Sequence, residues 1–240
     1  MHAGEASAFP PKFIPGEFTL EQYQLLFQRL NVGRYFINSA ILALGVSLIS
    51  LFVNSMAGFA FAKFHFRGKR PLFIFLLSSM IIPAQVTMLP IFLLLKQLGL
   101  LNSYLGVILP GMASIFGIFL ISQYLKTTPD SFIEAARMDG ASDFQIYWRV
   151  ILPLAKPILV TLALFTFMGS WNDFMWPLIV MSKASLFTLP VALSNLSGEY
   201  IQDTELMMAG SVITILPVIT IFLLLQKYYI HGILLGGVKE

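Results

Sequence analysis

Residues 38–62 have the sequence NSAILALGVSLISLFVNSMAGFAFA, a stretch without Lys, Arg, Asp or Glu. A helix needs about 20 consecutive apolar residues to cross the ~30 Å hydrocarbon core of a bilayer, and this stretch is long enough. A transmembrane β-barrel would instead show segments of about 10 residues that alternate between apolar and polar. No such alternation is present, so the stretch predicts a membrane-spanning helix.

Further apolar stretches of the same kind follow along the chain, and each lacks Lys and Arg: 72–95, 103–125, 158–181 and 206–226. The composition agrees, since 57% of the 240 residues are hydrophobic and 11% are charged, whereas soluble domains average about 25% charged. We therefore predict an all-α polytopic membrane protein with about five spans, in which residues 38–240 form one transmembrane domain embedded in the lipid bilayer. The absence of Cys excludes disulfides, thiolate metal sites and a cysteine nucleophile.

The basic residues predict the orientation in the membrane. Connections alternate between a strongly and a weakly basic side, and the strongly basic side holds Lys63, Arg67, Lys69, Arg70, Lys126, Arg137, Arg149, Lys156, Lys227 and Lys239. Because cytoplasmic loops carry the excess of Lys and Arg, we assign this side to the cytoplasm. The N-terminus is then outside and the C-terminus is cytoplasmic.

The N-terminal segment, residues 1–37, is predicted to lie on the outer side. Leu20, Tyr23, Phe27 and Leu30 share one helical face, and Thr19 with Gln22 fits a capping box, so we expect a short amphipathic helix at the membrane surface. The segment has no signal-peptide pattern. We expect a further element upstream, because otherwise this segment would have to cross the membrane unaided.

The longest polar connection, residues 126–157, has the sequence KTTPDSFIEAARMDGASDFQIYWRVILPLAKP. Thr128 and Pro129 predict the start of one short helix, and Gly140 predicts its end. Ser142 with Gln145 fits a capping box for a second helix. That second helix has an apolar face spaced i, i+3, i+4 and i+7, made of Phe144, Tyr147, Trp148 and Ile151.

A capped helix-turn-helix with an aromatic face has two interpretations on chemical grounds. It can dock on a cytoplasmic partner protein, with the aromatic residues as anchors, or it can lie on lipid headgroups. We exclude a DNA-reading role and any nucleic-acid partner, because the few basic residues of this loop are balanced by as many acidic ones and leave no footprint for phosphate.

Three motifs of this loop resemble the EAA loop of permease subunits of binding-protein-dependent ABC importers: Glu134-Ala135-Ala136, Asp139-Gly140-Ala141 and Ile151-Leu152-Pro153. Other segments are similar to the maltose-type second permease of the carbohydrate-uptake branch. These are Phe9-Pro10-Pro11-Lys12-Phe13, Thr127-Thr128-Pro129, Trp171-Asn172-Asp173-Phe174, Thr188-Leu189-Pro190, Gln226-Lys227-Tyr228-Tyr229, Gly232 and Gly236-Gly237-Val238-Lys239.

The resemblance implies that the loop is a coupling helix seated in a cleft of an ATPase subunit. It implies as partners an ATPase dimer, a second homologous permease and an extracytoplasmic sugar-binding protein, at the bacterial cytoplasmic (inner) membrane. The family core is normally preceded by one more helix. The candidate docking residues are Glu134, Ala135, Ala136, Asp139, Gly140, Phe144, Tyr147 and Trp148.

The sequence predicts no catalytic residue, metal site or cofactor of its own. It has no G-x-x-x-x-G-K-[ST] phosphate loop, so ATP is expected to be bound and hydrolysed by the partner subunit. Asp173 is the only ionisable residue in the predicted spans, which argues against an ion-driven secondary carrier.

Contact with substrate is expected of Trp171, Asn172 and Asp173, because a Trp ring, an amide and a carboxylate suit sugar recognition. The alternative is that these residues belong to an aromatic belt and to helix packing. The function predicted is a sugar permease working by alternating access. An ABC permease for another solute and a secondary carrier remain alternatives.

Overall fold

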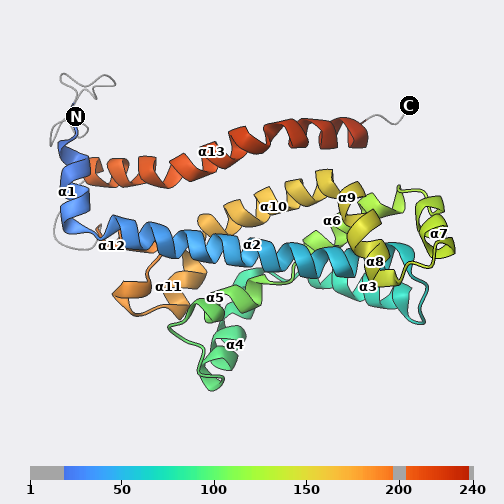
Figure 1. The fold of residues 1–240 in the computed structure, drawn as a ribbon. Helices are drawn as coiled ribbons and strands as arrows, with labels where there is room; N and C mark the ends of the chain where they lie inside the picture. The colour runs from blue at the N-terminus through green and yellow to red at the C-terminus, as the bar shows by residue number, and fades with distance from the viewer. Residues whose placement is uncertain (1–18, 197–203, 238–240) are drawn as a thin grey trace.

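The computed structural model describes residues 19–196 and 204–237, with only the backbone described for 227–237; Phe9–Phe13 lies outside this range. The described residues form helices and no strands, which confirms the predicted all-α class (Figure 1). The elements are α1 (Glu21–Arg29), α2 (Val32–Lys63), α3 (Lys69–Ser79), α4 (Ala84–Gln97), α5 (Tyr104–Gly111), α6 (Ile115–Lys126), α7 (Ser131–Met138), α8 (Asp143–Ile146), η1 (Tyr147–Ile151), α9 (Leu152–Leu154), α10 (Lys156–Trp171), α11 (Met175–Val180), η2 (Ala184–Leu186), α12 (Leu189–Asn195) and α13 (Thr204–Gly237).

Helix α2 is the central element of the bundle. It begins at Val32, earlier than the predicted 38, because the side chain of Asn31 caps it by accepting a hydrogen bond of 3.3 Å from the Arg34 N–H. Helices α6 and α10 pack against α2, and α13 packs along α10 (Figure 1). The N-terminal end of α2 therefore lies next to α1, and its C-terminal end lies next to the polar connection after α6.

Two described helices, α2 and α13, are long and apolar enough to cross a membrane alone. The stretches predicted at 72–95 and 103–125 are each broken in two, with a bend of 100° between α3 and α4 and of 42° between α5 and α6. Pro83, which lacks a backbone N–H, holds the α3–α4 junction extended at φ −60° and ψ 136°. Counting each bent pair as one span gives up to five spans.

The predicted span 158–181 also differs from a straight helix. Residues 172–174 separate α10 from α11. At the other end of α10, the helical segment Asp143–Leu154 and α10 together qualify as one bent span, with an angle of 80° between them. The Asp173 carboxylate accepts a hydrogen bond of 3.3 Å from the Trp176 N–H, which favours a new helix start there.

The α2–α6 contact is built from small and polar residues. Buried on this part of α2 are Ser50, Asn54, Ser55 and Gly58. Asn54 donates to the Ser50 hydroxyl at 2.7 Å and accepts from the Ser114 N–H at 2.9 Å, so it joins α2 to the start of α6. Asn54 is therefore an interhelical hydrogen-bonding residue.

The α1 end of the bundle is a small apolar cluster containing Leu26, Val32, Leu189 and Leu206. Helix α1 forms where the sequence predicts it, but a different face is buried, made of Gln22 and Leu26, while Leu20 and Phe27 are exposed. The buried face packs in the cluster shared with α12 and α13, and the exposed Leu20 and Phe27 leave the predicted contact of this helix with the membrane surface as a prediction. Thr19 accepts from the Glu21 N–H, so the predicted capping box with Gln22 does not form.

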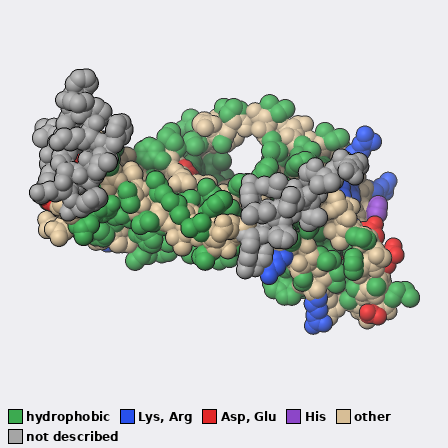
Figure 2. All heavy atoms as spheres, turned by 90° about the horizontal axis from the view of Figure 1, so that it is seen from above, with side chains coloured by type: hydrophobic (Ala, Val, Ile, Leu, Met, Phe, Trp, Pro, Cys, Tyr) green, Lys and Arg blue, Asp and Glu red, His purple; other side chains and the backbone are tan. Residues whose placement is uncertain are grey.

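Helices α3 and α4 are covered least by the described part of the chain. Leu95 is the only buried residue in the two helices, although they carry many large exposed apolar side chains, including Phe75, Val86 and Leu89. Figure 2 shows hydrophobic side chains along the length of the molecule and most of the visible charged ones at the end that holds α7 and α8. This distribution fits an element that meets lipid or another membrane protein.

Candidate docking site

The polar connection after α6 folds as a helical hairpin, which we call the α7–α9 hairpin (residues 127–155). Helix α7 begins at Ser131 after Asp130, two residues later than Thr128 and Pro129 predict. The reason is that the Thr128 carbonyl already accepts a hydrogen bond of 2.6 Å from the Lys63 ammonium of α2. The start of the hairpin is thereby fixed to the end of α2.

The turn after α7 is a Schellman motif. The Gly140 N–H donates to the Arg137 carbonyl and the Ala141 N–H donates to the Ala136 carbonyl, both at 3.0 Å. Gly140 has φ +78°, in the left-handed region that L side chains rarely adopt. An ion pair of 3.0 Å between Arg137 and Asp143 spans the turn. The angle between α7 and α8 is therefore set by backbone and side chain together.

The second helix begins at the predicted capping box. The Gln145 N–H donates to the Ser142 hydroxyl, and the Ser142 N–H donates to the Gln145 side chain at 2.8 Å. After one turn the helix widens into the π-helical turn η1 before α9, and the chain then bends into α10. A π-turn moves the side chains after it around the helix axis.

The inner face of the hairpin is part of the protein core. Ile133, Ile146 and Ile151 are buried in a cluster to which α2, α6 and α10 contribute Phe59, Ile121, Leu125 and Leu162. Tyr147 is 3% exposed, and its hydroxyl lies 2.7 Å from the Ser55 hydroxyl of α2. Tyr147 is thus a buried packing residue here and does not belong to the exposed aromatic face predicted for it.

The outer face of the hairpin exposes the other aromatic residues of the predicted stripe. Phe144 is 61% exposed and Trp148 is 55% exposed, and their rings are stacked with centroids 6.4 Å apart. Glu134, Ala135, Asp139 and Gly140 are exposed and Ala136 is half-buried. Sequence reasoning missed two exposed apolar residues, Phe132 and the 88% exposed Met138. Helical periodicity over residues 131–138 could have identified them, because both positions lie away from the face that carries Ile133.

Lys63 joins α2 to the hairpin through a second contact. Its ammonium donates to the Asp130 carboxylate at 2.5 Å, and the Lys63 side chain is only 6% exposed. The hydrogen bond and charge of Lys63 lower the pKa of the Asp130 carboxyl. The contact ties the α7 N-terminus to α2.

The second candidate group, Trp171-Asn172-Asp173, lies where α10 ends. Trp171 is buried, stacks on Phe167 with centroids 5.7 Å apart and donates to the Thr214 carbonyl of α13 at 2.9 Å. Asn172 is exposed and donates to the Met168 carbonyl, and Asp173 is half-buried. The structure therefore gives Trp171 a packing role and leaves Asn172 and Asp173 partly accessible.

The geometry defines a class of protein: a helical membrane component with broken spans and a rigid aromatic hairpin projecting from one end. Residues 54–234 match the family described as binding-protein-dependent transport system inner membrane component. The match covers most of the chain, so this protein belongs to that family. It is a permease component of ABC importers.

Two relatives and one solved structure show the range of this similarity. The chain is 40% identical to the arabinooligosaccharides transport system permease protein AraQ of Bacillus subtilis (strain 168), over 94% of this chain and 80% of the relative. It is 34% identical to the osmoprotective compounds uptake permease protein GgtD of Synechocystis sp., over 93% and 76%. A crystal structure of a bacterial ABC transporter that imports the acidic polysaccharide alginate contains a chain with TM-score 0.83 and 26% identity, covering 95% of this chain and 85% of that one.

Proposed function

We propose that the protein is the membrane-spanning permease subunit of a sugar importer, and that the α7–α9 hairpin docks on a separate ATPase subunit. The observation that carries the proposal is the division of the hairpin into two faces. Its inner face is packed into the core cluster, whereas Phe144 and Trp148 are exposed. Exposed aromatic residues on a rigid support are typical anchors of protein interfaces.

Glu134 supports the same interface. Its carboxylate is exposed, and among residues 19–196 and 204–226 it forms no ion pair or hydrogen bond. Arg137, which the spacing made a possible partner for Glu134, pairs with Asp143 instead. Glu134 is therefore available to a basic group of the ATPase, with Ala135 and Asp139 beside it on the exposed surface.

The packing of the hairpin explains how ATP-driven motion would reach the spans. Displacement of the hairpin acts on α2 through Tyr147 and Ser55, on α6 through Leu125 and Ile133, and on α10 through the chain itself. Because these helices are packed against one another, they move with the hairpin as a unit. This is the rigid-body switching required for alternating access.

The remaining partners and the orientation follow from exposure and charge. The exposed apolar face of α4 is suited to a second, homologous permease, and the α7 end, which holds most of the basic loops, is the cytoplasmic end. In this orientation helix α13 runs towards the cytoplasm (Figure 1). An extracytoplasmic binding protein would then deliver the sugar at the α1 end.

We infer a sugar substrate from the relatedness to AraQ, whose name specifies arabinooligosaccharides. The relative GgtD, named for osmoprotective compounds, favours a small polar solute as the second candidate. On this chain, Asn172 and Asp173 offer an amide and a carboxylate for hydroxyl groups. An Asp173→Asn variant with unchanged uptake kinetics would remove Asp173 from the substrate pathway.

The docking proposal is tested by affinity purification of the tagged chain from native membranes, with partners identified by mass spectrometry. Trp148→Glu places a charge in the interface and should abolish recovery of the ATPase while the second permease is retained. Trp148→Phe keeps the apolar ring and is the matched control. Full recovery of the ATPase with Trp148→Glu would refute docking through this face.

A further inference from the structure

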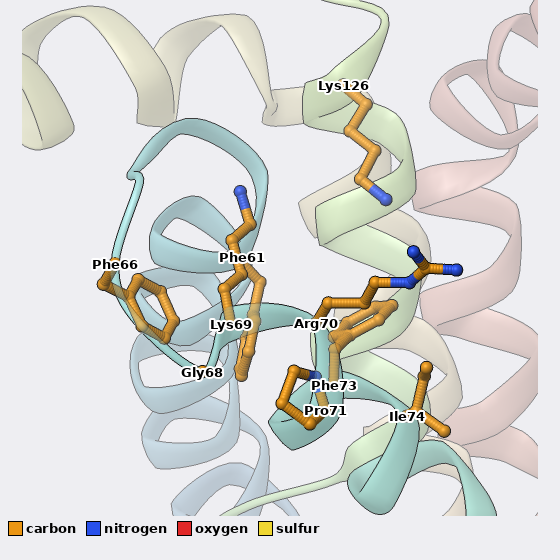
Figure 3. Close-up of a pocket in the computed structure, with 9 residues that line it drawn as sticks. All are labelled: Phe61, Phe66, Gly68, Lys69, Arg70, Pro71, Phe73, Ile74 and Lys126. Carbon is orange, nitrogen blue, oxygen red and sulfur yellow. The ribbon is translucent and has the colours of Figure 1, made fainter.

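A basic, aromatic-lined pocket lies at the α7 end of the bundle, apart from the exposed face of the hairpin. The pocket has a volume of about 530 Å³ and is formed where α2 ends, α3 begins and α6 ends (Figure 3). Its lining residues are Phe61, Phe66, Gly68, Lys69, Arg70, Pro71, Phe73, Ile74 and Lys126. The lining contains three basic side chains and no acidic one.

Two of the cations are not neutralised within the described part of the chain. Lys126 places its ammonium 5.3 Å from the centre of the Phe73 ring, and Arg70 extends its guanidinium from the same side of the pocket (Figure 3). Neither forms an ion pair with a described carboxylate; the nearby Asp130 is taken by Lys63. Like charges held near one another favour an anion between them.

The third basic residue of the lining, Lys69, is held by a hydrogen bond to the backbone. The Lys69 ammonium donates to the Phe64 carbonyl at 2.8 Å, which closes the loop from Phe64 to Gly68. This loop and its flanks have the sequence KFHFRGKR over residues 63–70, in which basic and aromatic side chains alternate. Such a pattern is typical of a segment at the boundary between water and the hydrocarbon core, where rings enter the bilayer and cations remain at headgroup level.

The depth of the pocket follows from the helices around it. The apolar helices α2 and α6 end at Lys63 and Lys126, and Lys126 lines the pocket, so the opening lies at the edge of the spans. Phe61 lies within α2 and Phe73 within α3, whereas Lys126 is the last residue of α6, so the lining combines rings from the spans with a cation at a span end. A ligand that fits both must carry an anionic group attached to an apolar body.

We propose that this pocket binds the headgroup of an anionic phospholipid, with its phosphate between Arg70 and Lys126 and its acyl chains along α3. The charge complementarity of the pocket and its position at the span ends point to this occupant. The proposal depends on membrane insertion alone, and it stands whether or not the hairpin docks on an ATPase.

The experiment is a lipid titration of the delipidated importer complex followed by native mass spectrometry. Phosphatidylglycerol and phosphatidylcholine with identical acyl chains are compared on the wild type and on Arg70→Gln/Lys126→Gln. We expect the wild type to prefer phosphatidylglycerol. The double variant should bind it roughly thirtyfold more weakly, since each basic residue near a membrane surface contributes about fivefold.

The controls separate charge from folding and from other ligands. Arg70→Lys/Lys126→Arg keeps both charges and should retain the preference, and Lys96→Gln/Lys183→Gln removes equal charge away from the pocket and should change nothing. If the double Gln variant fails to fold, each single variant should weaken binding about fivefold. Added inorganic phosphate should not displace the lipid.

Four results would overturn the proposal. They are equal binding of the two lipids by the wild type, an equal loss in the Lys96/Lys183 control, displacement of the lipid by inorganic phosphate, and loss of a partner subunit from Arg70→Gln/Lys126→Gln with lipid binding intact. The last result would assign the pocket to a protein contact.

Discussion

Gly140 determines the relation between the two helices of the hairpin by its backbone alone. Its φ is +78°, and a Cβ added there would meet no atom within 4 Å. A substitution at this position thus acts only through the cost of the left-handed conformation, about 1–2 kcal/mol for most L residues. A substitution at Gly140 therefore tests backbone strain without an added steric clash.

We predict that Gly140→Val abolishes association with the ATPase and leaves membrane insertion intact, because a β-branched residue forces the turn open outside the spans. Association is measured by copurification, and insertion by extraction of the chain from washed membranes. Gly140→Asn is the matched control, since Asn tolerates the left-handed region. Normal ATPase recovery with the Val variant would show that the hairpin angle is unimportant for docking.

A second prediction concerns Lys63 and Asp130. Lys63→Met should lower the thermal stability of the purified protein more than Asp130→Asn, because it removes the contacts to both Asp130 and the Thr128 carbonyl. The effects of the two changes should be less than additive in the double variant. Additive effects would mean that the two side chains do not interact in solution.

The pH dependence of this contact has a defined sign. Because the folded-state pKa of Asp130 is lowered, its contribution to stability is present above the pKa of the unfolded carboxyl and is lost as the pH falls through the folded-state value. The difference in melting temperature between the wild type and Asp130→Asn should therefore be largest near neutral pH and should shrink in acid. A thermal unfolding series across pH measures it.

At the scale of elements, the close approach of α2 and α6 depends on Gly58. A Cβ at Gly58 would lie 2.7 Å from Ile121 Cγ2 and 3.2 Å from the Ser122 backbone nitrogen. We predict that Gly58→Leu destabilises the fold by about 1–3 kcal/mol through overpacking. Gly33→Leu is the control in the same helix, because a Cβ there meets nothing within 4 Å.

Thermal unfolding in detergent checks the Gly58 prediction. Equal melting temperatures for Gly58→Leu and the wild type would show that α2 and α6 can separate without cost, which is incompatible with a shared core. An unchanged Gly33→Leu protein excludes a general effect of leucine in α2.

The sequence predicted the helical elements better than their bends. Hydropathy alone located every apolar stretch, because each must satisfy its backbone internally within lipid. A proline within an apolar stretch indicates a kink, but hydropathy did not predict the 100° bend at Pro83 or the break at 172–174. The hydrogen bond that Asp173 accepts from the Trp176 N–H depends on local geometry. Capping chemistry predicted the second hairpin helix at Ser142 but placed the first too early, because Lys63 occupies the Thr128 carbonyl.

The candidate site was predictable in its location and only partly in its residues. Helical spacing grouped Tyr147 with Phe144 and Trp148, yet Tyr147 turns inward to Ser55, a residue far away in sequence. Periodicity can define a face but cannot tell how deeply a π-turn rotates it into the core. Trp171 was grouped with Asn172 and Asp173 by side-chain chemistry, and its hydrogen bond to the Thr214 carbonyl of α13 favours the helix-packing alternative for this residue.

At the scale of the whole molecule, the charge distribution predicts which end faces the cytoplasm. The chain has no Cys, so a single introduced cysteine reports its own position without a background to remove. Met138→Cys lies at the α7 end and Lys183→Cys at the opposite end, and both positions are exposed.

We predict that a membrane-impermeant maleimide added to intact cells labels Lys183→Cys and not Met138→Cys, and that disruption of the membrane exposes Met138→Cys to the reagent. Labelling is read by a mass shift of the tagged chain. The reverse pattern would invert the proposed orientation and place the hairpin out of reach of a cytoplasmic ATPase.

The π-helical turn η1 makes the length of the hairpin as important as its composition. A π-turn is an α-helical turn that accommodates one extra residue, so the helix on either side of η1 stays in register only while that residue is present or removed within η1 itself. Deletion of one residue from α9 would instead rotate everything before it by about 100° relative to α10. The side chains of Phe144 and Trp148 would then point in a different direction from the bundle. In a comparison of related chains, insertions and deletions should therefore be excluded from α9 and tolerated in surface connections such as 182–188.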